Sequence, residues 1–150
     1  MLPSDEAASF EQRAVSTYIS PPFLTQATIF EFLARGRFEP NLARVREGLR
    51  ARRDAMLAAL EAISPAGLTW NRPEGGYFLW LELAGLESAE AAERAAQHGV
   101  AVVSGEDFFP VGSGLGRQSA RLAFSYEPPE RIAEGIERMC SALMPVSSSA

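Results

Sequence analysis

The stretch that decides the fold is Ala120-Arg121-Leu122-Ala123-Phe124-Ser125. Because side chains alternate between the two faces of a β-strand, Leu122 and Phe124 lie on one face, and Arg121 lies on the other between small residues. A guanidinium fixed in this way offers a planar carboxylate two parallel hydrogen bonds. Pro129 then begins a helix whose apolar residues recur at helical spacing. The sequence therefore predicts an arginine on a strand with a helix packed behind it.

The residues around this strand leave two roles open for Arg121. It either binds the anionic group of a ligand, or it forms a structural ion pair with Glu82 or another nearby carboxylate. Composition favours neither role.

The segments before and after the strand predict a mixed fold. Apolar periodicity indicates two N-terminal helices, over about residues 23–35 and 41–63. Strands are expected at residues 68–70, 77–83, 100–103 and 120–125, and further helices at 88–98 and 129–143. Two connecting helices followed by a ββαββα unit favour the α+β class, with a small sheet covered by helices. The strand at 77–83 is apolar on both faces, so we expect it to be central and covered on both sides.

The same pattern divides the chain into four parts. Residues 1–19 carry few apolar positions and are expected to form an N-terminal arm, and residues 20–63 hold the connecting helices. Residues 64–145 form the α+β domain, and the serine-rich tail at 146–150 is expected to be disordered.

The composition excludes several classes of function. All 14 basic residues are arginine, so no lysine is present to form a Schiff base, act as a general base or bind phosphate in a P-loop. One histidine and one cysteine cannot form a zinc site, and the single Cys140 excludes an internal disulfide, which favours a cytoplasmic protein. The net charge of −5 argues against nucleic acid as a partner. No apolar run approaches the roughly 20 residues of a membrane span.

Other chemistry-bearing residues have simple structural interpretations. His98 fits a cation at the C-terminus of a helix, and Cys140 fits a buried, inert thiol. Three glycines lack the spacing of a nucleotide-binding loop and are expected to form a mobile connection: Gly112, Gly114 and Gly116.

The arginines between residues 44 and 53 are compatible with a nucleic-acid stripe or with a solvated helix face. Glu47 and Asp54 stand within helical pairing distance of Arg50. This spacing favours a salt-bridged, solvated face.

Three segments, in the same order, resemble the class I and II aminotransferases of fold type I. Residues 72–81, RPEGGYFLWL, resemble the P-x-G-G-x-F-x-W segment of that family. Residues 99–108 resemble its G-V-x-x-x-P-G-x-x-F segment, with Ser104 in place of the proline. Residues 120–125 resemble its x-R-L-x-F-S segment.

Upstream segments extend the resemblance. Residues 32–36 and 50–54 are similar to the connecting helices of the aminoadipate-aminotransferase-like and MocR-like branches. The resemblance covers about residues 20–144 and implies the small domain of a fold-type I aminotransferase.

In such a domain, Arg121 corresponds to the arginine that binds the α-carboxylate of the substrate. The resemblance also implies pyridoxal 5'-phosphate in the parent enzyme, a homodimer, and a missing large domain that holds the cofactor. Because this chain has no lysine, we expect no cofactor to be bound covalently to it and none of its residues to be catalytic.

Three functions remain open from the sequence. The first is the substrate-clamping domain of an aminotransferase, which transfers an amino group between an amino acid and a 2-oxo acid. The second is the effector-sensing domain of a MocR- or GntR-type transcription regulator. The third is a free-standing, non-catalytic protein that hides its apolar faces by oligomerising.

Overall fold

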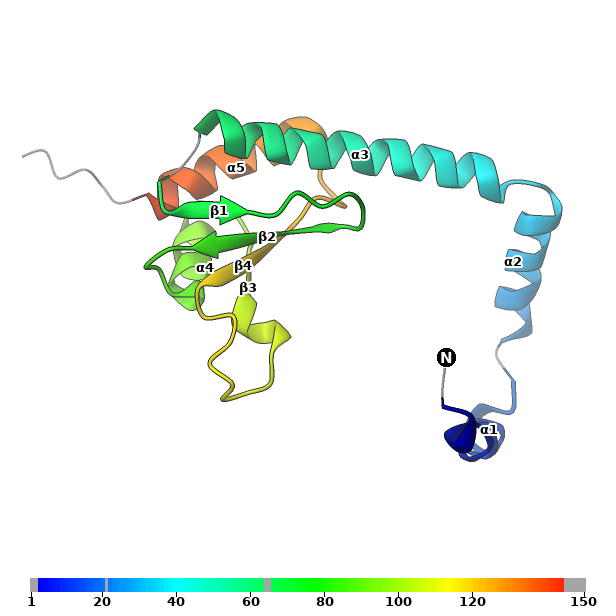
Figure 1. Ribbon diagram of the computed structural model, residues 1–150. Coiled ribbons are helices and arrows are strands. Elements are labelled where there is room, and N and C mark those ends of the chain that lie inside the picture. Colours follow the sequence, from blue (N-terminus) through cyan, green and yellow to red (C-terminus); the bar gives the residue numbers. More distant parts are fainter. Residues whose placement is uncertain (1–2, 21, 64–65, 145–150) are drawn as a thin grey trace, which may run out of the picture. The chain divides into compact units, whose positions relative to one another are not determined.

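The computed structural model describes residues 3–20, 22–63 and 66–144. It divides into two compact units, residues 1–45 and 46–150, and the boundary between them falls inside helix α3 (Phe38–Ile63). Figure 1 shows the helices and strands of each unit.

The first unit is helical. Helix α1 (Ser4–Tyr18) occupies most of the segment expected to be an arm, and α2 (Phe23–Ala34) follows it. The Ala, Glu, Gln and Arg residues of α1 have high helix propensity, which an apolar pattern alone does not reveal. After α2 comes Gly36, whose φ of 64° allows the left-handed turn that ends the helix.

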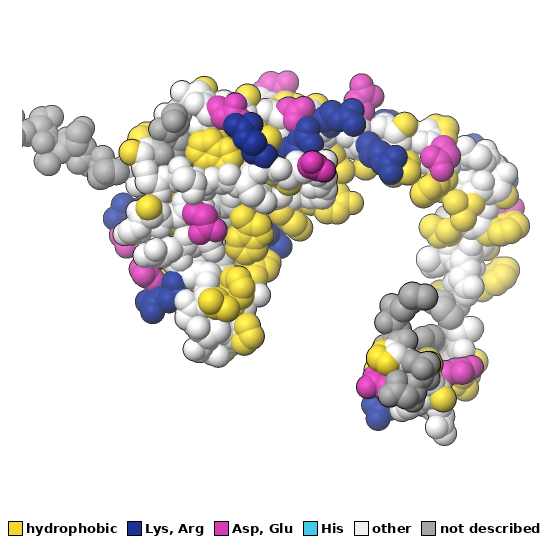
Figure 2. All heavy atoms as spheres, viewed as in Figure 1, with side chains coloured by type: hydrophobic (Ala, Val, Ile, Leu, Met, Phe, Trp, Pro, Cys, Tyr) yellow, Lys and Arg dark blue, Asp and Glu magenta, His cyan; other side chains and the backbone are white. Residues whose placement is uncertain are grey.

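Apolar side chains are exposed along α2. None of its residues is buried, and the exposed fractions of Phe23 and Phe30 are 83% and 68%. Figure 2 shows these hydrophobic side chains gathered along the helix. A helix of 12 residues with an apolar surface is marginally stable in water. Such a surface is typical of a site of interaction with another chain or domain.

The second unit is built on a four-stranded antiparallel sheet. Its strands are β1 (Leu68–Trp70), β2 (Phe78–Leu83), β3 (Val103–Ser104) and β4 (Ser119–Ala123), in the spatial order β1-β2-β4-β3. In the register of the two central strands, Leu79 pairs with Leu122 and Trp80 pairs with Arg121. The strand that carries Arg121 is therefore held by hydrogen bonds on both edges.

Helices cover one face of this sheet. They are the C-terminal part of α3, together with α4 (Ser88–Gln97) and α5 (Pro129–Leu143). The core between them and the sheet contains Leu79, Leu81 and Leu122, each at most 4% exposed. The alternation predicted for Leu122 and Phe124 is confirmed, because both side chains are buried.

The other face of the sheet is open in the part of the chain that the structure describes. Phe78 and Glu82 of β2 are exposed, and Trp80 is half-buried. The prediction that this strand is covered on both sides is therefore wrong for the described residues, although its central position is confirmed. Alternation places the leucines on the helix side and the aromatic residues on the open side.

The mixed α+β class is confirmed, with one difference in detail, at the start of the third strand. A short 3-10 helix, η1 (Gly105–Phe108), lies between β3 and β4. The third strand begins at Val103 and not at Val100, because the backbone N–H of Val100 donates to the carbonyl oxygen of Ala95 and closes the end of α4. The predicted tail at 146–150 lies outside the described residues.

Among the described residues, no helix combines the length with the apolar character that a membrane span needs.

Candidate carboxylate-binding site

Arg121 lies at the middle of β4, on the open face of the sheet. Its two cross-strand partners are Trp80 on β2 and Val103 on β3. The side chain is half-buried, whereas the neighbouring Ala123 on the same face is exposed. The guanidinium of Arg121 therefore lies on the open face of the sheet, beside small and apolar side chains, where a ligand or another domain can contact it.

Two phenylalanine rings contact the guanidinium. Its central carbon lies 3.8 Å from the centre of the Phe78 ring and 4.3 Å from the centre of the Phe108 ring. Phe78 comes from β2 and Phe108 comes from η1, which follows β3, so the two rings reach Arg121 from the two neighbours of its strand. Each ring face is electron-rich and attracts a cation by about 0.5–2 kcal/mol, depending on how far water is excluded.

The donors of Arg121 are unused within the described part of the chain. Nε is buried and has no hydrogen-bond partner, and no carboxylate lies within ion-pair distance of the guanidinium. Glu82, the partner considered from the sequence, pairs along the sheet with Ser119, two positions from Arg121. The described residues therefore do not support the structural ion pair.

The position of Phe108 depends on a close backbone contact. A Cβ on Gly105, at the start of η1, would lie 2.6 Å from the carbonyl oxygen of Gly116. Gly116 has a φ of 77° and precedes β4, so the contact joins η1 to the start of that strand. The ring of Trp80 also meets the Phe108 ring edge-on, with centroids 5.2 Å apart and planes at 79°.

This contact is a feature that the sequence analysis missed. The sequence predicts a mobile connection at Gly116, yet its carbonyl oxygen lies against Gly105 and also accepts a hydrogen bond from the Ser119 hydroxyl. The spacing of Gly105 and Gly116 matches no standard turn, so no local pattern identifies it.

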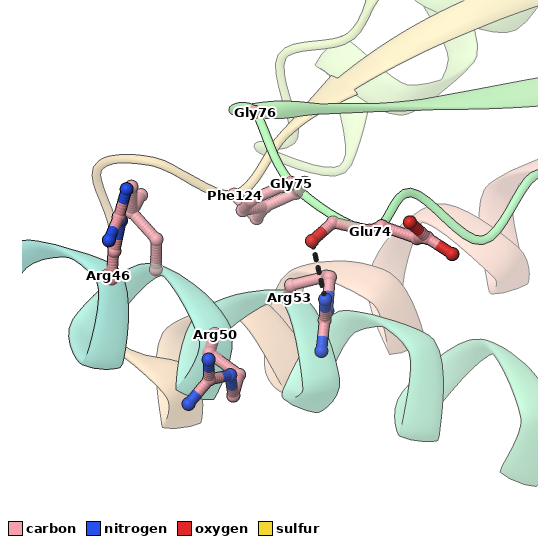
Figure 3. Close-up of a pocket in the computed structure, with 8 residues that line it drawn as sticks. Arg46, Arg50, Arg53, Glu74, Gly75, Gly76 and Phe124 are labelled. Carbon is pink, nitrogen blue, oxygen red and sulfur yellow. Dashed lines mark hydrogen bonds between the residues drawn. The ribbon is translucent and has the colours of Figure 1, made fainter.

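A hollow of the same unit is lined by arginines of α3. Its volume is about 410 Å³, and its lining includes Arg46, Arg50, Arg53 and Phe124. Figure 3 shows these side chains beside the turn that holds Gly75 and Gly76. Arg53 donates hydrogen bonds to the carbonyl oxygens of Pro73 and Glu74, so it ties the helix to that turn.

The salt-bridged face predicted for α3 is only partly present among the described residues. Asp54 pairs with Arg53 at 2.6 Å, and not with Arg50. Figure 2 shows the basic side chains spread along the helix. Arg53 acts chiefly as a structural cation, because its guanidinium is shared between Asp54 and two backbone carbonyls.

His98 and Cys140 occupy structural positions. The Nδ1 of His98 donates to the carbonyl oxygen of Arg94, in the last turn of α4. Cys140 is fully buried in the core, and this burial raises the pKa of its thiol to about 11. Within the described ranges, no three His, Cys, Asp or Glu side chains lie close enough to hold a metal ion.

These features match one family of known proteins. The family model described as "Aminotransferase class I and II" matches residues 2–139. The chain belongs to the class I and II aminotransferase family. The unpaired arginine of β4 and the surrounding sheet are therefore parts of an aminotransferase fold.

Relatives within the family include enzymes and regulators. The chain is 37% identical over 120 residues to the aromatic-amino-acid aminotransferase 1 of Thermococcus litoralis, covering 79% of this chain and 28% of that protein. It is 32% identical over 126 residues to the transcriptional regulator TauR of Rhodobacter capsulatus, covering 82% of this chain and 25% of that protein.

A solved structure of high similarity is the α-aminoadipate aminotransferase LysN of Thermus thermophilus, which contains N-(5'-phosphopyridoxyl)-L-leucine. The TM-score is 0.79 and the identity is 37%, over 88% of this chain and 33% of that one. The chain thus spans 28% and 25% of the length of these two relatives and 33% of the LysN chain.

Proposed function

We propose that this chain supplies the carboxylate-binding part of an aminotransferase that moves an amino group between an amino acid and a 2-oxo acid. Arg121 binds the carboxylate that both substrates share. The observation that carries this proposal is the guanidinium of Arg121, which contacts two aromatic rings and has no anionic partner among the described residues.

The chemistry of the site favours a carboxylate. A guanidinium and a carboxylate are both planar, so two parallel N–H···O bonds form at once. Hydrogen bonds to charged groups contribute about 1.5–3 kcal/mol each, and more where water is excluded. Because Nε is buried, the two terminal nitrogens of Arg121 are the ones that meet the ligand.

The residues of this chain do not fit the covalent anchoring of pyridoxal 5'-phosphate. That cofactor is held through a lysine amine, and the chain contains no lysine. Its own part in the reaction is to bind and orient the substrate through Arg121. The cofactor and its lysine belong, in this proposal, to a large domain outside these 150 residues.

The wider assembly follows from the same proposal. The apolar residues exposed on α2, and those on the open face of the sheet, such as Phe78, need partner surfaces. We assign these surfaces to the large domain and to a second subunit of a homodimer. A cytoplasmic location agrees with the single cysteine.

The proposal is tested on the native polypeptide that contains these residues, purified from its source. Arg121→Lys replaces a planar fork by a point charge and is expected to lower kcat/KM roughly 10- to 100-fold for amino acid and 2-oxo acid alike. Arg117→Lys is the control, because Arg117 is exposed and pairs with Glu87. Unchanged kinetics in Arg121→Lys would remove this residue from the site.

The similarity to TauR favours a second candidate, an effector-sensing domain of a transcription regulator. The same arginine would then bind the carboxylate of an effector without turnover. A native polypeptide that binds amino or 2-oxo acids through Arg121, but transfers no amino group, supports this candidate. Amino-group transfer that depends on Arg121 supports the enzyme.

A further inference from the structure

We propose that Phe78 and Phe108 are positioning residues that orient the guanidinium of Arg121 in place of a counter-ion. This inference rests on the proposed function. The unusual feature is a half-buried cation whose Nε has no partner. A protein usually satisfies such a charge with a carboxylate. Among the described residues, two ring faces contact this cation instead. The Cζ atom of Arg121 lies 3.8 Å from the centre of the Phe78 ring and 4.3 Å from the centre of the Phe108 ring.

An aromatic ring face leaves the N–H donors of Arg121 free for a ligand, whereas a carboxylate does not. A carboxylate would accept hydrogen bonds from the guanidinium and compete directly with an incoming ligand. An aromatic face attracts the cation through its quadrupole and accepts none of the in-plane N–H groups. Arg121 is thus stabilised in the empty site while its hydrogen-bonding edge stays available.

The positions of both rings are themselves fixed. Phe78 is held by the register of β2 against β4, where it pairs with Ala123. Phe108 is held by the edge of Trp80 and by the contact of Gly105 with Gly116. A side chain whose orientation is set before the ligand arrives loses little conformational entropy on binding. The two rings therefore pre-organise the guanidinium of Arg121.

The inference is tested by the NMR signal of the Arg121 Nε–Hε group in the native polypeptide that contains these residues, labelled with 15N-arginine. Arg121→Lys identifies the signal by its loss. A proton next to two ring faces is displaced by their ring currents, so the Arg121 signal is expected to lie apart from those of exposed arginines. A wild-type Arg121 signal within the exposed group would overturn the inference without any further variant.

Substitutions then test whether the ring of Phe108 causes the displacement of the Arg121 signal. Phe108→Leu is expected to move the Arg121 signal toward the exposed group, and Phe108→Tyr, which keeps an aromatic face, is expected to leave it displaced. Phe109→Leu is the matched control, because Phe109 is the next residue, is 38% exposed against 40% for Phe108, and makes no ring contact with Arg121 in the described structure. An unmoved signal in Phe108→Leu, or an equal shift in Phe109→Leu, contradicts the inference.

Carboxylate binding separates this inference from the proposed function. In the native polypeptide, Phe108→Leu is expected to raise KM for the 2-oxo acid roughly two- to fivefold, the range of one exposed cation–π contact, with kcat much less affected. A displaced Arg121 signal together with normal kinetics in Arg121→Lys would refute the proposed function and leave the ring contacts standing. A KM in Phe108→Leu equal to that in Phe109→Leu would refute the positioning role.

Discussion

Gly105 and Gly116 approach so closely that neither position has room for a Cβ atom. The contact joins the start of η1 to the residues that lead into β4, and so it sets where Phe108 meets Arg121. The contact between Phe108 and Arg121 therefore depends on the close approach of two glycines.

Gly116→Ala is expected to destabilise the chain by roughly 2–5 kcal/mol. The new Cβ would overlap the carbonyl of Gly105, and the residue would keep an unfavourable positive φ. Gly112→Ala is the control, because Gly112 has a similar φ of 81° but nothing within 4 Å of a Cβ, so its loss is expected to be about 1 kcal/mol. Urea denaturation measures the free energy of unfolding of both variants. Equal losses in the two variants would show that the contact with Gly105 does not contribute to stability.

Arg53→Ala is expected to lower the free energy of unfolding by about 1–2 kcal/mol. The substitution removes two hydrogen bonds to the carbonyl oxygens of Pro73 and Glu74, which tie α3 to the turn before β2. Arg50→Ala, on the same helix and in the same hollow, is expected to change the stability by no more than about 0.5 kcal/mol. Denaturant midpoints of the two variants make the comparison. A loss in Arg50→Ala as large as in Arg53→Ala would contradict the role of these bonds.

Cys140 is expected to be inert toward thiol reagents near neutral pH. Burial raises its pKa from 9.0 to about 11, so the reactive thiolate is scarce in the folded state. Because the pKa is higher in the folded than in the unfolded chain, the associated stability is full below about pH 9 and falls as the pH rises toward 11. Labelling with a thiol reagent at pH 8, with and without urea, checks this. Rapid labelling of the folded chain would contradict the burial of the thiol.

The sequence predicted those features that depend on neighbours along the chain. Alternation placed Leu122 and Phe124 in the core and Arg121 on the opposite face, and helical spacing located α5. It failed at backbone contacts that no pattern of side chains marks. The hydrogen bond from the Val100 N–H to the Ala95 carbonyl moves the start of β3 to Val103. The contact of Gly105 with Gly116 corresponds to no recognisable sequence pattern.

The role of Arg121 shows the same limit. The residues alone could not choose between a ligand and an ion pair with Glu82, because that choice depends on the register of β2 against β4. The register pairs Glu82 with Ser119 and brings Phe78 to the guanidinium instead.

The most direct test of the central claim compares two ligands on two forms of the native polypeptide. The affinities of a 2-oxo acid and of its amide, which has no negative charge, are measured for the wild type and for Arg121→Gln. If Arg121 binds the carboxylate, the wild type prefers the acid roughly 10- to 100-fold, and Arg121→Gln loses most of that preference. The same preference in both forms would show that the carboxylate binds elsewhere.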